Sequence, residues 1–423
     1  MSLLIFAIPL TVNAEEIIKK GETLNLERCI EIALKMQPNI FAAISTVNIN
    51  ESRIGQAKSN YYPQFNWSSS YNKISPASGA SESPFGTSGG SYDRYFTGLT
   101  LSQMIYDFGK TPTQVEIENL NLDSSRSDLR NTTDQIILAV KQAYYGVVQA
   151  KYTVLVTEDT VKQTQQQLDQ AKAFYEVGTK PKFDVTKAGV DLSNAKLNLI
   201  RNKNSFKLAI VKLNNIMGIP DAPEYTLDEN MTFAKYEMTL ENALAKAYEN
   251  RPDLKSIVAK RRAAESSITL AKTGYYPVLT GNAAYSWSGE QFPLDQGWDV
   301  GLGLSFPLFS GYLTKYQVQE ARANLNVLKA NEESLRQTVF LEVEQAYVTL
   351  MSAEEAIPTA KLGVEQAKEN LEIANGRYAA GVGNPLEVTD AEVGLANARN
   401  SYIQSLYADK VAQAALEKAI GLR

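Results

Sequence analysis

Histidine is absent from this sequence of 423 residues, and cysteine occurs once, at Cys29. The lack of histidine excludes histidine triads, His-ligated zinc and the commonest general base at neutral pH. A single cysteine forms no intramolecular disulfide and no cysteine-cluster metal site. No Gly-rich phosphate loop follows a strand pattern either. We therefore expect a protein that is not an enzyme and has no cofactor.

Basic residues are slightly outnumbered, with 42 Lys and Arg against 47 Asp and Glu, so the net charge is −5. A nucleic-acid-binding protein would need a basic face, and the sequence disfavours that class. No apolar run reaches the roughly 18 residues that a membrane-spanning helix needs, which excludes a helical membrane protein.

The first residues have the pattern of an exported protein. An apolar stretch over residues 3–10 precedes Ala14, and two glutamates follow. This predicts the remnant of a signal peptide over residues 1–14, without the positive residues that usually begin one. A frayed apolar N-terminus is the alternative. Cys29 lacks the small residues that precede a lipidated cysteine, so we interpret it as a buried helix residue.

Two copies of one unit account for the chain after residue 14. The first part of the unit recurs at an offset of 214 residues and the later part at 203, without a gap. The difference falls in a loop rich in Ser, Gly and Pro over residues 73–93. We predict a first repeat over residues 15–219, an inter-repeat equatorial segment over residues 220–237 and a second repeat over residues 238–423. The aligned residues include Pro38 with Pro252, Tyr61-Tyr62-Pro63 with Tyr275-Tyr276-Pro277, and Tyr175 with Tyr378.

Each repeat contains two segments in which apolar and polar residues alternate, as Trp298, Val300 and Leu302 do with their small or polar neighbours. The alternation predicts strands. Strands of about ten residues with one apolar and one polar face fit a lipid-facing, water-lined barrel. A sheet packed on a soluble core is the alternative. The predicted strands span residues 63–73, 93–107, 277–288 and 297–309.

Heptad seams predict helices far longer than those of most globular domains. Apolar residues recur at 4,3 spacing from Ile136 to Tyr175 and from Val339 to Tyr378. Large residues alternate with Ala or Thr, which favours antiparallel coiled-coil packing. We expect Pro358 to interrupt and bend the second long helix. The predicted long helices span residues 113–177 and 313–380, and the return helices residues 183–217 and 386–420.

This organisation resembles the TolC family of outer-membrane efflux and secretion channels. The motif Tyr-x-x-Gly-x5-Asp/Glu-Val occurs twice, once from Tyr175 to Val185 and once from Tyr378 to Val388. The resemblance implies a mainly α fold in which four strands from each of three chains complete a 12-stranded membrane β-barrel above an α-helical periplasmic tunnel. Four strands alone cannot close a membrane barrel, so the residues themselves also predict an oligomer.

The resemblance further implies a passive channel-tunnel in the outer membrane of a Gram-negative bacterium, gated at its periplasmic tip. The expected partners are a periplasmic adaptor (membrane fusion) protein and an inner-membrane pump of the resistance-nodulation-division or ABC type. Multidrug efflux, export of metals or small molecules, and type I protein secretion remain open as roles. A non-conducting periplasmic coiled-coil structural or adaptor protein is the alternative function.

The candidate site lies at the two turns that follow the long helices. Glycine at 178 and 381 suits left-handed helix C-caps. The exposed turns are the candidate adaptor-contact surface, which comprises Gly178, Thr179, Lys180, Gly381, Val382 and Gly383. Gly383 stands where a well-understood relative has a gating arginine, so that latch is not carried over.

In the family, acidic residues ring the periplasmic entrance at positions matched here by Glu387 and Asp390. We expect these two residues and Tyr378 to form the periplasmic constriction. Rings of carboxylates favour cations and are able to bind divalent ions. The alternatives are helix capping for Glu387, after Asn384 and Pro385, and seam packing for Tyr378. Neither acidic residue has an evident partner, whereas Asp184 of the first repeat has Lys187 one turn later.

Aromatic residues gather where the predicted strands meet the helices. Tyr61, Tyr62, Tyr275 and Tyr276 fall at this level in the two repeats. Clustering of this kind predicts an interfacial girdle. Packing at the strand-to-helix junction is the alternative.

Overall fold

The computed structural model describes residues 18–75 and 91–422. The predicted signal-peptide remnant and most of the loop over residues 73–93 lie outside these ranges. The described chain divides into two compact units, and each draws on both repeats. We call residues 45–127 with 255–333 the strand unit, and the described parts of residues 1–44, 128–254 and 334–423 the helical unit.

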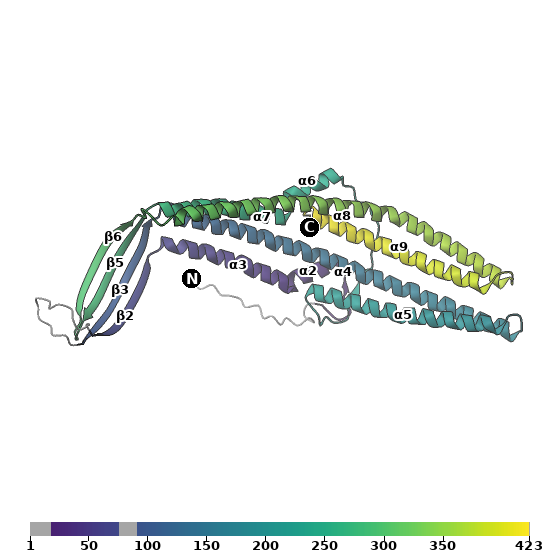
Figure 1. Cartoon of the computed structure of the whole chain (residues 1–423). Helices are drawn as coiled ribbons and strands as arrows, with labels where there is room; N and C mark the ends of the chain where they lie inside the picture. Colours follow the sequence, from purple (N-terminus) through teal and green to yellow (C-terminus); the bar gives the residue numbers. More distant parts are fainter. Residues whose placement is uncertain (1–17, 76–90, 423) are drawn as a thin grey trace, which may run out of the picture. The chain divides into compact units, whose positions relative to one another are not determined.

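The strand unit contains one four-stranded antiparallel sheet, with strand order β2-β3-β5-β6 (Figure 1). Pairing joins the two repeats, because β3 of the first lies beside β5 of the second, with Leu99 opposite Tyr285. The last strand ends at Ser305 rather than near residue 309, since Pro307 has no main-chain N–H to donate. The strands are β2 (Gln64–Ile74), β3 (Tyr92–Tyr106), β5 (Val278–Gly289) and β6 (Asp295–Ser305).

The edge strands of this sheet are exposed on both faces. In β6, the side chains of Trp298, Val300 and Leu302 are 75%, 73% and 75% exposed, and every other residue of the strand is exposed as well. All of β2 except Ile74 is likewise exposed. A sheet packed on a soluble core would bury its apolar face, so that alternative is wrong for the described chain.

Four long helices follow the heptad seams: α4 (Lys110–Glu176), α5 (Lys182–Met217), α8 (Leu313–Ala379) and α9 (Pro385–Ala419). The 67 residues of α4 give a length of about 100 Å. The expected interruption at Pro358 is wrong, because α8 continues through it. Leu350, Ala353 and Ile357 are buried next to the proline, so packing offsets the lost hydrogen bond. None of the described helices is long and apolar enough to cross a membrane.

Each repeat also has a pair of shorter helices that meet at a proline. These are α2 (Leu26–Met36), α3 (Pro38–Lys58), α6 (Leu240–Asn250) and α7 (Pro252–Lys272). Cys29 lies in α2 and is fully buried, which confirms its interpretation. The short strands β1 (Thr23–Leu24) and β4 (Thr226–Leu227) form a parallel pair that the sequence did not predict.

Separate apolar cores hold the helices of the helical unit together. In the first repeat Ile32, Val140 and Leu213 are among the residues of one cluster. In the second repeat the equivalent residues of the seams, Val343 and Leu416, belong to another. A duplicated sequence has therefore produced two cores of the same design within one unit.

Candidate functional site

The turn between α4 and α5 is a left-handed helix cap. Gly178 has a φ of +78°, the conformation expected of it at this position. The main-chain N–H groups of Thr179 and Lys180 both donate to the oxygen of Phe174, at 2.9 and 3.3 Å. The cap ends the long helix and reverses the chain within a few residues.

The turn between α8 and α9 repeats this design, with a φ of +77° at Gly381. The N–H groups of Val382 and Gly383 both donate to the oxygen of Arg377, at 3.0 and 2.9 Å. A Cβ atom at Gly383 would lie 2.7 Å from the nitrogen of Tyr378. The turn therefore excludes a side chain at the position where the latch arginine was considered. Figure 1 shows both turns at the same end of the helical unit.

Tyr378 lies in a small apolar cluster just inside the turns. It packs with Leu371, Val388 and Leu395, and its ring contacts Phe174 edge-to-face at a centroid distance of 5.9 Å. The ammonium of Lys180 lies 5.5 Å from the centre of the same ring. Tyr378 thus joins both repeats by packing. Burial raises the pKa of its hydroxyl, and the carboxyl of Asp184 adds to that shift.

The ion pair of the first repeat differs from the expected one. Lys187 pairs with Asp191, at 2.9 Å, and not with Asp184. The i,i+4 spacing brings the two side chains together on one face of α5, and the carboxylate of Asp191 also accepts a hydrogen bond at 3.4 Å from the hydroxyl of Thr389 on α9. Asp184 is instead buried, beside Tyr378.

Glu392 is a buried acidic residue that the sequence analysis missed. It is 5% exposed, and burial followed by the nearby charge of Asp191 raises the pKa of its carboxyl to about 7. A signal was present in the sequence, since Glu392 lies between Val388 and Leu395 at i−4 and i+3, on the apolar face of α9.

The two acidic residues of the predicted constriction are both exposed, but their surroundings differ. The carboxylate of Glu387 accepts a hydrogen bond at 3.2 Å from Nε of Arg377, so the expectation that it has no partner is wrong. The α8–α9 turn brings these residues together, which charge spacing along one helix does not reveal. For Asp390 the described residues provide no ion pair. Asn384 caps α9 as predicted, because its side chain accepts from the N–H of Leu386.

Within the described ranges, no group of three or more acidic or cysteine side chains is placed to hold a metal ion in a single chain. The four tyrosines of the predicted girdle belong to the strand unit and are all exposed. Tyr276 also stacks on Phe108, with a centroid distance of 6.2 Å. The tyrosines at the junction of strands and helices are therefore exposed, and at least Tyr276 also packs against a neighbouring ring.

Both repeats of the chain are similar to known proteins. Residues 29–219 and 243–422 each match the family described as outer membrane efflux protein. Outer membrane protein TolC of Escherichia coli (strain K12) is 25% identical over 344 residues, which cover 76% of this chain and 68% of that protein. Outer membrane efflux protein BepC of Brucella suis is 22% identical over 383 residues, which cover 89% and 80%.

Solved structures show the same fold. The CmeC outer membrane channel of Campylobacter jejuni superposes with a TM-score of 0.83 at 19% identity, over 94% of this chain and 85% of that one. The duplicated helical hairpins and their shared sheet, together with the family match of both repeats, define a channel protein of the outer membrane. The chain belongs to the outer membrane efflux protein family. It is an efflux channel of a Gram-negative outer membrane, and nothing in the comparisons supports the non-conducting alternative.

Proposed function

We propose that three copies of this chain assemble into one passive export conduit, which carries out no catalysis. Their four-stranded sheets would close a 12-stranded barrel, and their long helices would form the tunnel below it. The unpaired edges of the sheet are the main support for this proposal. Within the described residues β2 and β6 each pair with one strand only, so each presents a free edge to another copy.

Exposed apolar stripes on the helices support the same assembly. Exposed apolar side chains gathered along one face of a helix are typical of an interface. Along α5 the residues of the stripe are 7, 3, 8 and 3 positions apart, which keeps them on one face of the helix. The stripe on α5 comprises Val190, Leu197, Ile200, Leu208 and Val211, and the stripe on α8 comprises Leu341, Val348, Leu362 and Ile373.

Light scattering on the purified chain, with and without detergent, tests the assembly. We expect a trimer that requires detergent, because the apolar face of β6 would otherwise meet water. A monodisperse monomer in plain buffer would contradict both the shared barrel and the conduit.

The turns are the proposed contact surface for a periplasmic adaptor protein, which would connect the channel to an inner-membrane pump of the resistance-nodulation-division or ABC type. Val177, Phe183 and Val382 support this role, since all three are apolar and about 70% exposed. Apolar side chains at the tip of a turn are suited to bind a partner. Replacing residues 178–183 and 381–386 by Gly-Ser segments should abolish adaptor binding in a pull-down. Retained affinity in both replacements would argue against this surface.

A carboxylate constriction is the proposed selectivity element of the tip. Threefold symmetry would place six carboxylates, from Glu387 and Asp390, around the entrance, and such rings favour cations. Because Arg377 offsets the charge of Glu387, Asp390 would carry most of the effect. Substitution of both acidic residues by Ala should lower the permeability of cations relative to anions in planar bilayers. Tyr378 would contribute by packing the turns together.

A further inference from the structure

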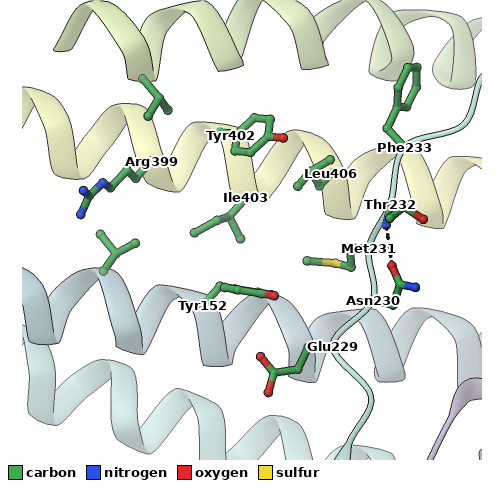
Figure 2. A pocket seen from close by; sticks show the side chains of 12 residues that line it. Tyr152, Glu229, Asn230, Met231, Thr232, Phe233, Arg399, Tyr402, Ile403 and Leu406 are labelled. Atoms are coloured by element: carbon green, nitrogen blue, oxygen red, sulfur yellow. Dashed lines mark hydrogen bonds between the residues drawn. The ribbon is translucent and has the colours of Figure 1, made fainter. Parts of the chain in front are cut away.

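A cavity of about 670 Å³ lies within the helical unit, between α4 and α9 (Figure 2). Figure 2 shows Tyr152 on α4, Ile403 on α9 and Met231 of the inter-repeat segment pointing toward the same space. This volume is within the range of sites that enclose drug-sized molecules. The remaining lining residues are Val156, Glu229, Asn230, Thr232, Phe233, Val364, Arg399, Tyr402 and Leu406.

The inter-repeat segment forms one wall and is anchored on both sides of the cavity. Before the wall, the hydroxyl of Tyr144 donates to the main-chain oxygen of Asp228 at 2.5 Å, and Lys151 forms an ion pair with Glu229. Beyond it, the N–H of Tyr236 donates to the carboxylate of Glu354 at 2.8 Å.

These anchors come from both repeats, because positions 151 and 354 are equivalent at the offset of 203 residues. Between the anchors Met231 is buried, at 8% exposure. The wall is therefore in place without a ligand, which lowers the cost of ordering it on binding.

The chemistry of the walls favours a neutral ligand. Each charged side chain of the lining already has an opposite charge: Glu229 has Lys151, and Arg399 has Asp159 at 3.4 Å. The rest is largely apolar or aromatic. A charged molecule would lose hydration there without gaining an unpaired counter-charge.

Two hydroxyls remain available for hydrogen bonds. The phenol groups of Tyr152 and Tyr402 have no hydrogen-bond partner within the described chain. Tyrosine hydroxyls in largely apolar surroundings usually find a partner, which a ligand with one polar group would supply.

The repeats have diverged at this point. In the equivalent half of the duplication, Glu355 replaces Tyr152 and Lys203 replaces Leu406. Ile200, the equivalent of Ile403, is 67% exposed instead of buried. Part of the apolar lining, Tyr152 and Leu406, is therefore specific to this half of the duplication.

We infer that this cavity is a binding site for a neutral, drug-sized molecule with an apolar or aromatic body and a hydrogen-bonding group. The inference goes beyond the proposed conduit and does not rest on it, because it concerns binding in the wall of the helical unit and not passage between chains.

Fluorescence titration with N-phenyl-1-naphthylamine tests the site. This neutral aromatic amine becomes fluorescent in apolar surroundings. The full chain, purified in amphipol, should show a saturable component above the linear partition of the probe into amphipol. Ile403→Trp and Val156→Phe place extra volume inside the cavity and should weaken that component by about tenfold or more. Val393→Trp is the control, since it adds a tryptophan at a 53% exposed position of the same helix α9 outside the cavity, and it should leave the component unchanged.

Circular dichroism shows whether each filled variant folds. If neither does, Leu406→Lys replaces them, because lysine is the natural residue of the equivalent position in the other repeat. Loss of the saturable component in a folded variant with retention in Val393→Trp supports the site. Absence of saturable binding in the unmodified chain, or equal binding in all variants, overturns it.

Discussion

Gln37 and Arg251 occupy equivalent positions in the two repeats, and each donates a hydrogen bond to the main chain near the end of a return helix. Nε2 of Gln37 lies 3.0 Å from the oxygen of Ile216. Nη1 of Arg251 lies 3.2 Å from the oxygen of Ala419. The same junction thus uses a neutral amide in one repeat and a cation in the other.

Replacing Arg251 by Gln should destabilise the second repeat, although Gln serves the first. The guanidinium is buried and lies 2.6 Å from the carboxylate of Asp253 and 2.7 Å from that of Glu342. Its loss would leave Asp253 without its cation, and Glu342 would keep only the ammonium of Lys418, at 3.6 Å. We expect a loss of about 3 kcal/mol in the free energy of unfolding, measured by urea denaturation of the helical signal.

The matched change in the first repeat is Gln37→Ala, which removes one neutral hydrogen bond and should cost about 1 kcal/mol. A loss for Arg251→Gln no larger than that of the control would contradict a role for the ion pairs.

A comparison of two glycines distinguishes the cost of a left-handed backbone from the cost of steric crowding. Gly178 and Gly218 have nearly the same left-handed φ, +78° and +77°. A Cβ atom at Gly178 would meet nothing within 4 Å, whereas at Gly218 it would lie 2.6 Å from the oxygen of Met36. Gly178→Ala should cost about 1 kcal/mol of unfolding free energy, from the left-handed conformation alone.

Gly218→Ala should cost clearly more, on the order of 3 kcal/mol, because the α2–α3 junction must shift as well. Thermal unfolding of the two variants in parallel measures the difference. Equal losses would mean that the contact with Met36 relaxes freely.

Local features were predictable from the sequence because their causes are local. The cap at Gly381, the N-cap at Asn384 and the buried Cys29 each follow from residue types a few positions apart. The heptad seams predicted the long helices for the same reason, and the duplication provided each pattern twice.

Contacts between distant segments were not predictable. Arg377 pairs with Glu387 only because the turn brings two helices together, and β1 pairs with β4 across some 200 residues. Lys187 pairs with Asp191 while Asp184 is buried, and the charge spacing along the helix does not distinguish these two carboxylates. At Pro358 the local pattern predicted an interruption of the helix, but α8 continues because tertiary packing outweighed the helix-breaking preference of proline.

Packing at the tip should weaken as the pH rises. The ordinary pKa of a glutamate is about 4.5, and in the folded chain that of Glu392 is about 7. Between these values the folded state holds a proton that the unfolded state has released. Stability from this group is therefore fully present below about pH 4.5 and is lost as the pH rises through about 7.

Hydrogen exchange of peptides from α9, corrected for intrinsic rates, should show stronger protection near pH 5.5 than near pH 8. Glu392→Gln keeps a neutral side chain of similar shape and should remove this dependence. Glu387→Gln, an exposed change on the same helix, is the control and should retain it. An unchanged pH dependence in Glu392→Gln would exclude Glu392 as its source.

The cation selectivity of the tip should depend more on Asp390 than on Glu387. Arg377 lies 3.2 Å from Glu387 and offsets its charge, whereas the described residues provide no ion pair for Asp390. Asp390→Asn should lower the permeability ratio of cations to anions by roughly twofold, and Glu387→Gln should lower it less. Arg377→Gln should raise the ratio, since it exposes the charge of Glu387. Reversal potentials across a salt gradient in planar bilayers measure all three variants. A lower ratio in Arg377→Gln would show that the arginine does not oppose the carboxylates at the entrance.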